Sequence, residues 1–162
     1  MRTSACIEVA APIEEVWKIV SDPGRALSFM SGVTRWEVAS ENATGLGARY
    51  RVLLRVGSAE IGGLIEVVEW DEPFDYAWTS VTGVDQRGRF RLRRTRDGCT
   101  RVQMRLAYGV AGSGPFGWIA EQLAAPTVRA HLRRTVQQLK RLVEYEQLRE
   151  RAAARRAAAA GG

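Results

Sequence analysis

The sequence predicts one α+β domain, in which a curved antiparallel sheet of seven strands wraps around a long C-terminal helix. Apolar and polar residues alternate near the N-terminus and again over 33–110, where glycine- and proline-rich breaks recur at short intervals. After Gly114 the apolar spacing becomes helical. A length of 162 residues suits one core but is short for two, so we place a single domain at 1–148 and a tail at 149–162.

The first strand is followed by two short helices. Residues 3–10 alternate between apolar and polar side chains, which predicts a half-buried strand. Pro12 suits the first turn of a helix, and apolar residues follow at helical spacing as far as Val20. The sequence Ser-Asp-Pro-Gly at 21–24 breaks that helix, and 25–30 predicts a second short one.

Six more strands are predicted between residues 33 and 110. Turn residues separate them at 41–45, 57–58, 71–73, 82–85 and 96–98. Alternation gives the sheet an inner apolar and aromatic face with Tyr50, Val52, Leu54, Tyr76, Trp78, Phe90, Met104 and Tyr108. The outer face is basic, with Arg87, Arg89, Arg91, Arg93, Arg101 and Arg105. Gly62 and Gly63, in mid-strand, predict a bulge or bend that helps the sheet curl.

The final helix is predicted from Phe116 onward. The residues of its mostly apolar stripe recur at three and four positions, and they are Leu123, Val128, Leu132, Thr135, Val136, Leu139, Leu142 and Val143. Pro126 is expected to kink it. The Ala- and Arg-rich tail has no apolar stripe, so it is expected to extend the helix, to fray and to carry no function.

Composition excludes several functional classes. No apolar run approaches the roughly 20 residues of a membrane span, and the N-terminus lacks the apolar segment of a secretory signal, so we expect a soluble, cytoplasmic protein. Two cysteines and one histidine offer little for a metal site or disulfides, and no cofactor is expected. The net charge of +6 comes from arginine-rich composition, and outward aromatics for nucleic-acid stacking are scarce.

Three stretches resemble a known superfamily. They are Ile7-Glu8-Val9-Ala10-Ala11-Pro12 running into Val16-Trp17 and Ser21-Asp22-Pro23, then 66–73 (EVVEWDEP) running into Tyr76-Ala77-Trp78, and Gly114-Pro115-Phe116-Gly117. Over residues 3–146 the chain resembles the START-like (SRPBCC) superfamily with the helix-grip fold, in its polyketide cyclase/dehydrase and lipid-transport branch. These are scaffold motifs, which identify the fold better than an activity.

The resemblance implies a cavity for a hydrophobic small molecule such as a lipid, a polyketide or another aromatic compound. The residues expected to line it are Tyr50, Val52, Leu54, Tyr76, Trp78, Phe90, Met104, Tyr108, Trp118, Leu123 and His131. Trp36 and Trp118 are candidates for its mouth, although core packing explains them as well. No catalytic motif of the related aromatase/cyclases matches positions in this chain.

Three functions therefore remain open. The first is binding or transport of a hydrophobic small molecule. The second is an aromatase/cyclase or dehydratase, in which inner tyrosines, an inward Arg94 or His131 would orient a polyketide and move protons. His131 is more simply explained as a hydrogen-bonded residue at the edge of the helix stripe. The third is an interaction module that binds a protein or an anionic surface through the basic sheet face or the arginine-rich side of the helix. No nucleic-acid partner is expected. The sequence leaves open whether the protein is a monomer or a homodimer.

Overall fold

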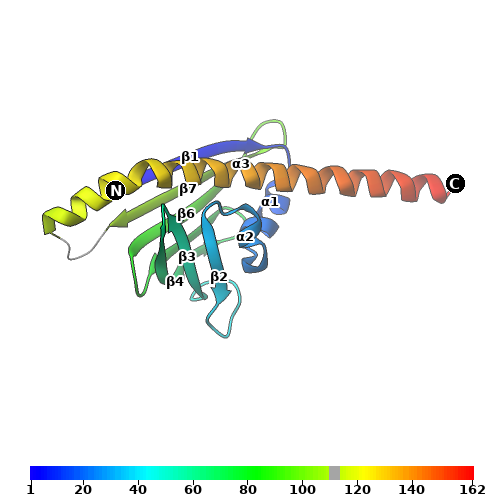
Figure 1. Ribbon diagram of the computed structural model, residues 1–162. Helices are drawn as coiled ribbons and strands as arrows, with labels where there is room; N and C mark the ends of the chain where they lie inside the picture. Colours follow the sequence, from blue (N-terminus) through cyan, green and yellow to red (C-terminus); the bar gives the residue numbers. More distant parts are fainter. Residues whose placement is uncertain (110–113) are drawn as a thin grey trace.

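The computed structural model describes the backbone of residues 1–109 and 114–162, and the side chains of 1–109 and 125–162 (Figure 1). The elements are β1 (Arg2–Val9), α1 (Ile13–Val20), a 3-10 turn (Pro23–Arg25), α2 (Ala26–Phe29), β2 (Val33–Val38), β3 (Arg49–Val56), β4 (Ala59–Asp71), β5 (Asp75–Ser80), β6 (Asp85–Arg94), β7 (Thr100–Gly109) and α3 (Gly114–Ala160). The predicted order of one strand, short helices, six strands and a long helix is confirmed.

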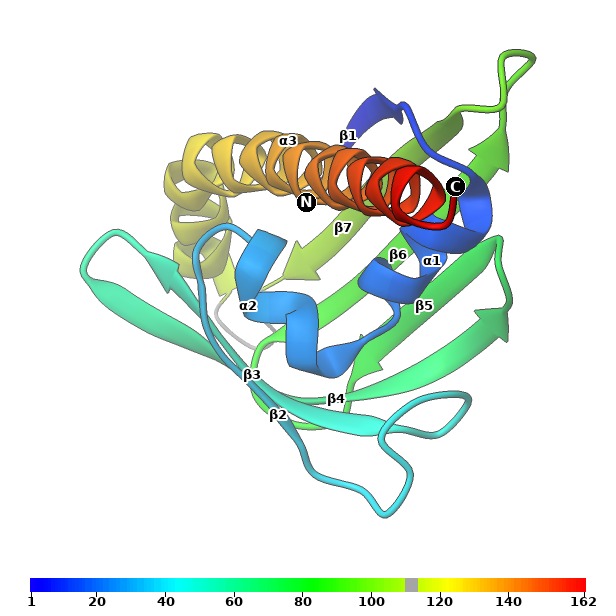
Figure 2. The ribbon, with the colours of Figure 1, turned by 90° about the vertical axis from the view of Figure 1, so that its right-hand side faces the viewer.

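The strands form one antiparallel sheet in the order β1-β7-β6-β5-β4-β3-β2. The sheet curls, and the three helices lie on its concave side, with α3 running along β1 and β7 (Figure 2). This arrangement follows from the sequence pattern, because only the concave face of the sheet is apolar and α3 offers the matching apolar stripe. The predicted α+β helix-grip class is therefore confirmed.

The core lies between the sheet and one side of α3. The stripe residues Val128, Leu132, Val136, Leu139 and Val143 are all buried, at the spacing of one helix face. Polar contacts fix the middle of α3 to the end of β1, since Lys140 Nζ donates to the carbonyl oxygen of Glu8 at 2.8 Å and the amide of Ala10 donates to Glu144 at 2.9 Å.

The glycine pair of β4 has a different role from the predicted bulge. The register between β3 and β4 is continuous across Gly62 and Gly63, and the irregularity of β4 falls between Val67 and Glu69 in its pairing with β5. A Cβ on Gly62 would lie 2.0 Å from the carbonyl oxygen of Val52, and one on Gly63 would lie 2.0 Å from that of Thr82. The glycines thus permit close backbone approach on both sides of β4.

The tail continues α3. The helix runs unbroken from Gly114 through Pro126 to Ala160, so residues 149–160 extend it, and their fraying stays a prediction. The last turns project beyond the sheet (Figure 1). The kink expected at Pro126 stays a prediction.

Candidate functional site

The concave side of the sheet encloses a small apolar hollow under α3. Its volume is about 40 Å³, and residues of β2 to β7, α3 and the segment after α2 line it. Five of the residues predicted to line a cavity lie here, namely Val52, Leu54, Trp78, Met104 and His131. Trp36, a candidate for the mouth of the cavity, also lines it, and residues that the prediction omitted complete the wall, among them Met30, Val33, Ile61, Val128 and Leu132.

A second hollow of about 10 Å³ lies beside the first. Tyr76 and Phe90 line it, together with residues of α1, α2 and the turn between them. Met30 and Trp36 line both hollows, so these two side chains separate one space from the other. Trp118 and Leu123 of the predicted lining lie outside the described side chains.

Aromatic rings form a continuous cluster on the inner face. The ring centroids of Trp36 and Tyr50 are 5.4 Å apart, and those of Trp36 and Trp78 are 6.2 Å apart. Trp78 also lies 5.3 Å from Tyr76 and 6.0 Å from Phe90. Such separations favour edge-to-face and offset contacts, so the rings stabilise one another while presenting an apolar wall.

Gly88 of β6 makes room for the Trp78 ring. A Cβ at this position would lie 2.0 Å from Cζ2 of Trp78, which is the separation of overlapping atoms. The two residues are directly opposite in the β5–β6 pairing. The role of Gly88 was not predicted, because a glycine in an alternating strand does not indicate which residue lies opposite it on the neighbouring strand.

The three tyrosines of the predicted lining differ in their surroundings. Tyr50 donates from its hydroxyl to the carbonyl oxygen of Ala43 at 2.7 Å, and Tyr108 donates to Sδ of Met1 at 3.4 Å, so neither hydroxyl is directed at a hollow. Burial, with a smaller contribution from the charge of Asp22, raises the pKa of Tyr50 to about 12. Burial raises the pKa of Tyr76 well above its usual value. At neutral pH both Tyr50 and Tyr76 are neutral phenols, which donate hydrogen bonds and do not act as bases.

His131 connects α3 to two other segments. Its Nε2 lies 3.1 Å from the carbonyl oxygen of Arg55, which only accepts, so Nε2 carries the proton in the neutral ring. Nδ1 then accepts from the Ser31 hydroxyl at 3.1 Å. The ring packs on Gly32, where a Cβ would lie 2.5 Å away, and the Ser31 amide donates to Thr135 at 2.9 Å. Both ring nitrogens are hydrogen-bonded, so His131 joins α3 to the segment after α2 and to the end of β3 at the edge of the hollow.

Arg94, which the enzyme alternative gave a catalytic role, lines neither hollow. Its guanidinium donates to Glu14 at 2.5 Å, and it lies over the Phe74 ring, 5.2 Å from the centroid. Its side chain is 55% exposed. Arg94 is the last residue of β6 and keeps the parity of Phe90 and Leu92, but there its side chain reaches α1 at the edge of the concave side and not the hollow.

Trp36 carries an unused hydrogen-bond donor. Its Nε1 is buried and finds no hydrogen-bond partner among the described residues. A buried N–H without a partner costs free energy, so such a group in a native structure indicates a missing acceptor. Trp36 lines both hollows, so this donor belongs to a residue of their shared wall.

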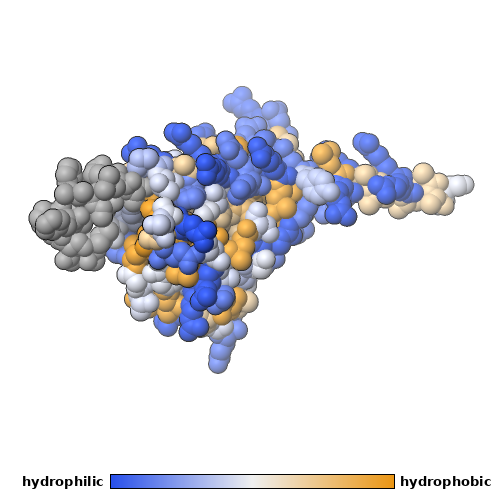
Figure 3. Space-filling model, in the orientation of Figure 1, coloured by the Kyte–Doolittle hydropathy of each residue, from blue (hydrophilic) through white to orange (hydrophobic). Residues whose placement is uncertain are grey.

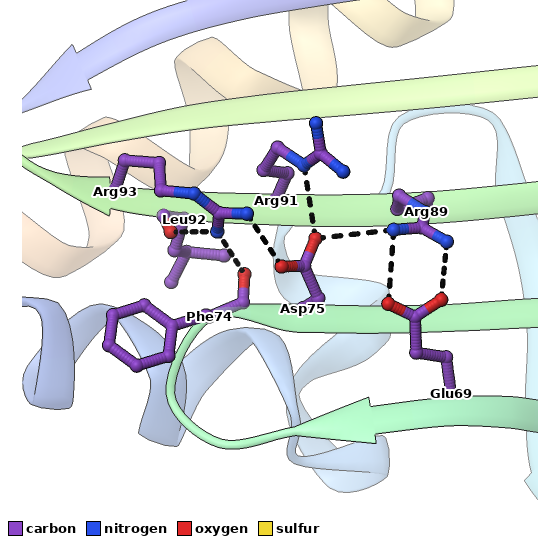
Figure 4. A network of polar contacts seen from close by, with 7 residues as sticks. All are labelled: Glu69, Phe74, Asp75, Arg89, Arg91, Leu92 and Arg93. Atoms are coloured by element: carbon purple, nitrogen blue, oxygen red, sulfur yellow. Dashed lines mark hydrogen bonds and ion pairs between the residues drawn. The ribbon is translucent and has the colours of Figure 1, made fainter.

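The outer sheet face also has a hollow, of about 930 Å³, whose walls mix apolar residues such as Val68 and Leu106 with charged ones, among them Arg2, Arg87, Arg89 and Arg105. Next to it, Asp75 is nearly buried beneath three arginines of β6 (Figure 4). It accepts from Arg89 at 3.4 Å, from Arg91 at 3.1 Å and from Arg93 at 2.7 Å. Glu69 binds Arg89 with both oxygens. Acidic partners on the face therefore neutralise much of its β6 arginine row.

Two further observations bear on chemistry. Across the described residues, no group of three or more His, Cys, Asp and Glu side chains is placed to hold a metal ion. None of the described helices is long and apolar enough to cross a membrane.

Several solved structures share this fold. A protein from Thermus thermophilus is 20% identical, with a TM-score of 0.75 over 88% of this chain and 97% of that one. A START superfamily protein from Mycobacterium smegmatis is 22% identical, with a TM-score of 0.67 over 91% and 98% of the two chains. The di-domain ARO/CYC protein BexL is 18% identical, with a TM-score of 0.58 over 85% of this chain and 46% of its own.

The sequence itself finds no match among curated proteins. It does match a family model, described as polyketide cyclase / dehydrase and lipid transport, over residues 1–144. That range includes all seven strands and most of the packed part of α3. The chain therefore belongs to the polyketide cyclase / dehydrase and lipid transport family.

Proposed function

We propose that the protein binds a hydrophobic small molecule between the concave face of the sheet and α3. The observation that carries this proposal is the buried Nε1 of Trp36, which lacks a partner among the described residues and belongs to a side chain that lines an apolar hollow. An apolar molecule with one carbonyl or hydroxyl oxygen suits both features, because its body replaces apolar contacts and its oxygen accepts the free N–H.

Binding requires the hollow to open. A space of about 40 Å³ holds water-sized molecules, whereas sites for drug-sized ligands usually span about 300–1,000 Å³. Met30 and Met104 line the hollow, and their unbranched side chains rotate at low cost. We therefore expect a ligand to displace these two side chains and to occupy the space they fill in the structure.

Leu54 offers a way to block the site from its wall. Leu54 lines the hollow from β3, while its neighbour Leu53 has the opposite parity and lies in a separate outer depression. Leu54→Trp is expected to weaken the binding of the neutral apolar dye N-phenyl-1-naphthylamine at least about tenfold, because the larger ring occupies the hollow. A fluorescence titration measures this. Leu53→Trp is the matched control and should stay within about twofold of wild type.

Equal affinities for Leu54→Trp and Leu53→Trp would contradict an internal site. Circular dichroism at the temperature of the titration confirms that both variants are folded. If the dye binds neither the variants nor the wild type, the proposed function loses its support altogether.

The Trp36 donor is tested separately with a carbonyl-bearing dye. Trp36→Phe keeps a ring in the wall and removes Nε1, so it should weaken the ketone dye prodan about fivefold, the usual effect of one hydrogen bond. N-phenyl-1-naphthylamine lacks a carbonyl, and its affinity should change less. An equal loss for the two dyes would show that Trp36 contributes packing alone.

An aromatase/cyclase role is the second candidate. It draws on the family description, on the fold shared with an ARO/CYC protein and on the neutral Tyr76 phenol beside the smaller hollow. In that role Tyr76 would orient a substrate oxygen as a hydrogen-bond donor, because its raised pKa prevents it from acting as a base at neutral pH. The two candidates differ in what happens to the bound molecule, since a binding protein releases it unchanged and an aromatase/cyclase releases a cyclised product.

A further inference from the structure

The solvent side of α3 carries a long row of arginines. The row, which we call the arginine stripe, consists of Arg133, Arg134, Arg141, Arg149, Arg151, Arg155 and Arg156, all exposed. At 100° per residue these positions fall within an arc of about 160°, opposite the buried stripe, and at 1.5 Å per residue they span about 35 Å. Figure 3 shows hydrophilic side chains over the middle of α3 and a mixture of hydrophilic and apolar ones along its projecting end.

The charge of the stripe is not balanced within the protein. In the part of the chain that the structure describes, the ion pairs of α3 join Lys140 to Glu144 and Arg25 to Glu146, and none includes a stripe arginine. Glu150 lies on the opposite side of the helix by the same 100° spacing. The outer sheet face differs, because Asp75 and Glu69 neutralise its β6 arginines.

Two apolar side chains interrupt the stripe near its centre. Tyr145 is 59% exposed and Leu148 is 63% exposed, and both fall within the arc of the arginines. The guanidinium of Arg149 lies 5.9 Å from the centre of the Tyr145 ring. The stripe is therefore a basic amphipathic surface on one straight helix, with its apolar part in the middle.

Beyond Glu146 the helix leaves the domain. The Arg25–Glu146 contact is the last ion pair that joins α3 to the rest of the protein among the described residues. Residues 149–160 then project past the sheet as a free helical arm (Figure 1). The sequence assigned no function to this segment, yet its four arginines extend the stripe to nearly three times the length that Arg133, Arg134 and Arg141 span.

We propose that the arginine stripe binds the surface of a membrane that contains anionic lipid. Arginines attract lipid phosphates, while Leu148 and Tyr145 enter the boundary between head groups and acyl chains, which is the usual binding mode of basic amphipathic helices. A nucleic acid would meet the same arginines but would gain little from an exposed leucine. A second copy of the stripe would repel the first. This inference does not depend on the proposed function.

Co-sedimentation with lipid vesicles tests the stripe. The wild type should bind vesicles in which phosphatidylglycerol makes up about a third of the lipid, should bind phosphatidylcholine vesicles weakly, and should dissociate as salt is raised. The quadruple variant R149Q/R151Q/R155Q/R156Q should lose at least about tenfold in vesicle affinity. Leu148→Ala, which keeps every charge, should lose about threefold through its smaller apolar surface.

The matched control removes four positive charges from the outer sheet face, in the variant R51Q/R87Q/R101Q/R105Q. Its vesicle affinity should stay within about threefold of wild type, because that face lies on the other side of the sheet from α3. Equal losses in the two quadruple variants would overturn the proposal in favour of net charge alone. Tight binding to duplex DNA without binding to anionic vesicles would overturn it in favour of nucleic acid.

Discussion

Replacing Gly88 with alanine is expected to destabilise the protein by about 3 kcal/mol, which is the upper range for overpacking a core. The added Cβ would lie 2.0 Å from Cζ2 of Trp78, and β6 cannot move away without breaking its pairing with β5 and β7. Trp78 must therefore shift, and it contacts the rings of Trp36, Tyr76 and Phe90. Chemical denaturation measures the loss.

A double-mutant cycle shows whether the Trp78 ring is the cause. Trp78→Phe removes the part of the indole that Gly88 accommodates, so the double variant should be more stable than the sum of the two single losses by at least about 1 kcal/mol. Arg87→Ala, one residue away with an exposed side chain, is the control and should change stability by less than about 0.5 kcal/mol. Additive losses in the cycle would show that the crowding lies elsewhere.

Asp75→Asn is expected to destabilise the protein by about 2 kcal/mol at neutral pH. Removing one partner of a buried ion pair commonly costs about 3–5 kcal/mol, and the partial exposure of the three arginines lowers that figure. The asparagine would leave Arg89, Arg91 and Arg93 on one strand face without the carboxylate that separates their charges. Asp85→Asn is the matched control, since Asp85 is exposed and makes no ion pair within the described residues.

The loss in Asp75→Asn should depend on pH in a defined direction. Burial alone would raise the pKa of Asp75, but hydrogen bonds and charges from Arg93 and Arg91 outweigh it and hold the pKa below its usual value. A lowered pKa in the folded state stabilises the protein above the unfolded-state value of about 3.9, and this contribution disappears as pH falls through the folded-state pKa. The stability gap between wild type and variant should therefore be constant from pH 7 to about pH 5 and close at more acidic pH. A gap that persists unchanged into strong acid would contradict the assignment.

The alternation of side chains was sufficient to predict the sheet and its inner face. Period-two patterns determine which residues share a side, so Val52, Trp78 and Met104 were placed together on one face, and they meet at the hollow. The length and helical spacing of α3 likewise predicted its position over that face, because no other element could cover it. These features depend on the spacing of apolar residues along the chain, and a single sequence is sufficient to identify that spacing.

The sequence could not predict contacts that depend on strand register. Asp75 is opposite Arg91 only because of the β5–β6 pairing, and alternation alone does not reveal that it lies among three arginines. The space that Gly88 leaves for Trp78 depends on the same pairing. Strand parity places Arg94 on the inner side, but it does not reveal that Glu14 of α1 lies beside that end of β6 and binds the guanidinium.

The volume of the hollow also could not be predicted from the sequence. A curled sheet around one helix predicts an interior gap, but the side chains that line it decide how much of the gap remains. Met30, Trp36 and Leu132 occupy the space; Met30 and Leu132 were not predicted to line it, and Trp36 was a candidate only for its mouth. For the tail, the sequence predicted no role. The structure shows that it continues α3, which places its arginines in one row with those of the packed part of the helix.

Native mass spectrometry of freshly purified protein, before and after denaturing organic extraction, tests the internal binding site most directly. The account predicts an apolar adduct that extraction releases from the wild type and from Leu53→Trp, and that is depleted in Leu54→Trp. A clean mass for the wild type, or an adduct retained equally by Leu54→Trp and Leu53→Trp, would contradict a ligand held between the sheet and α3.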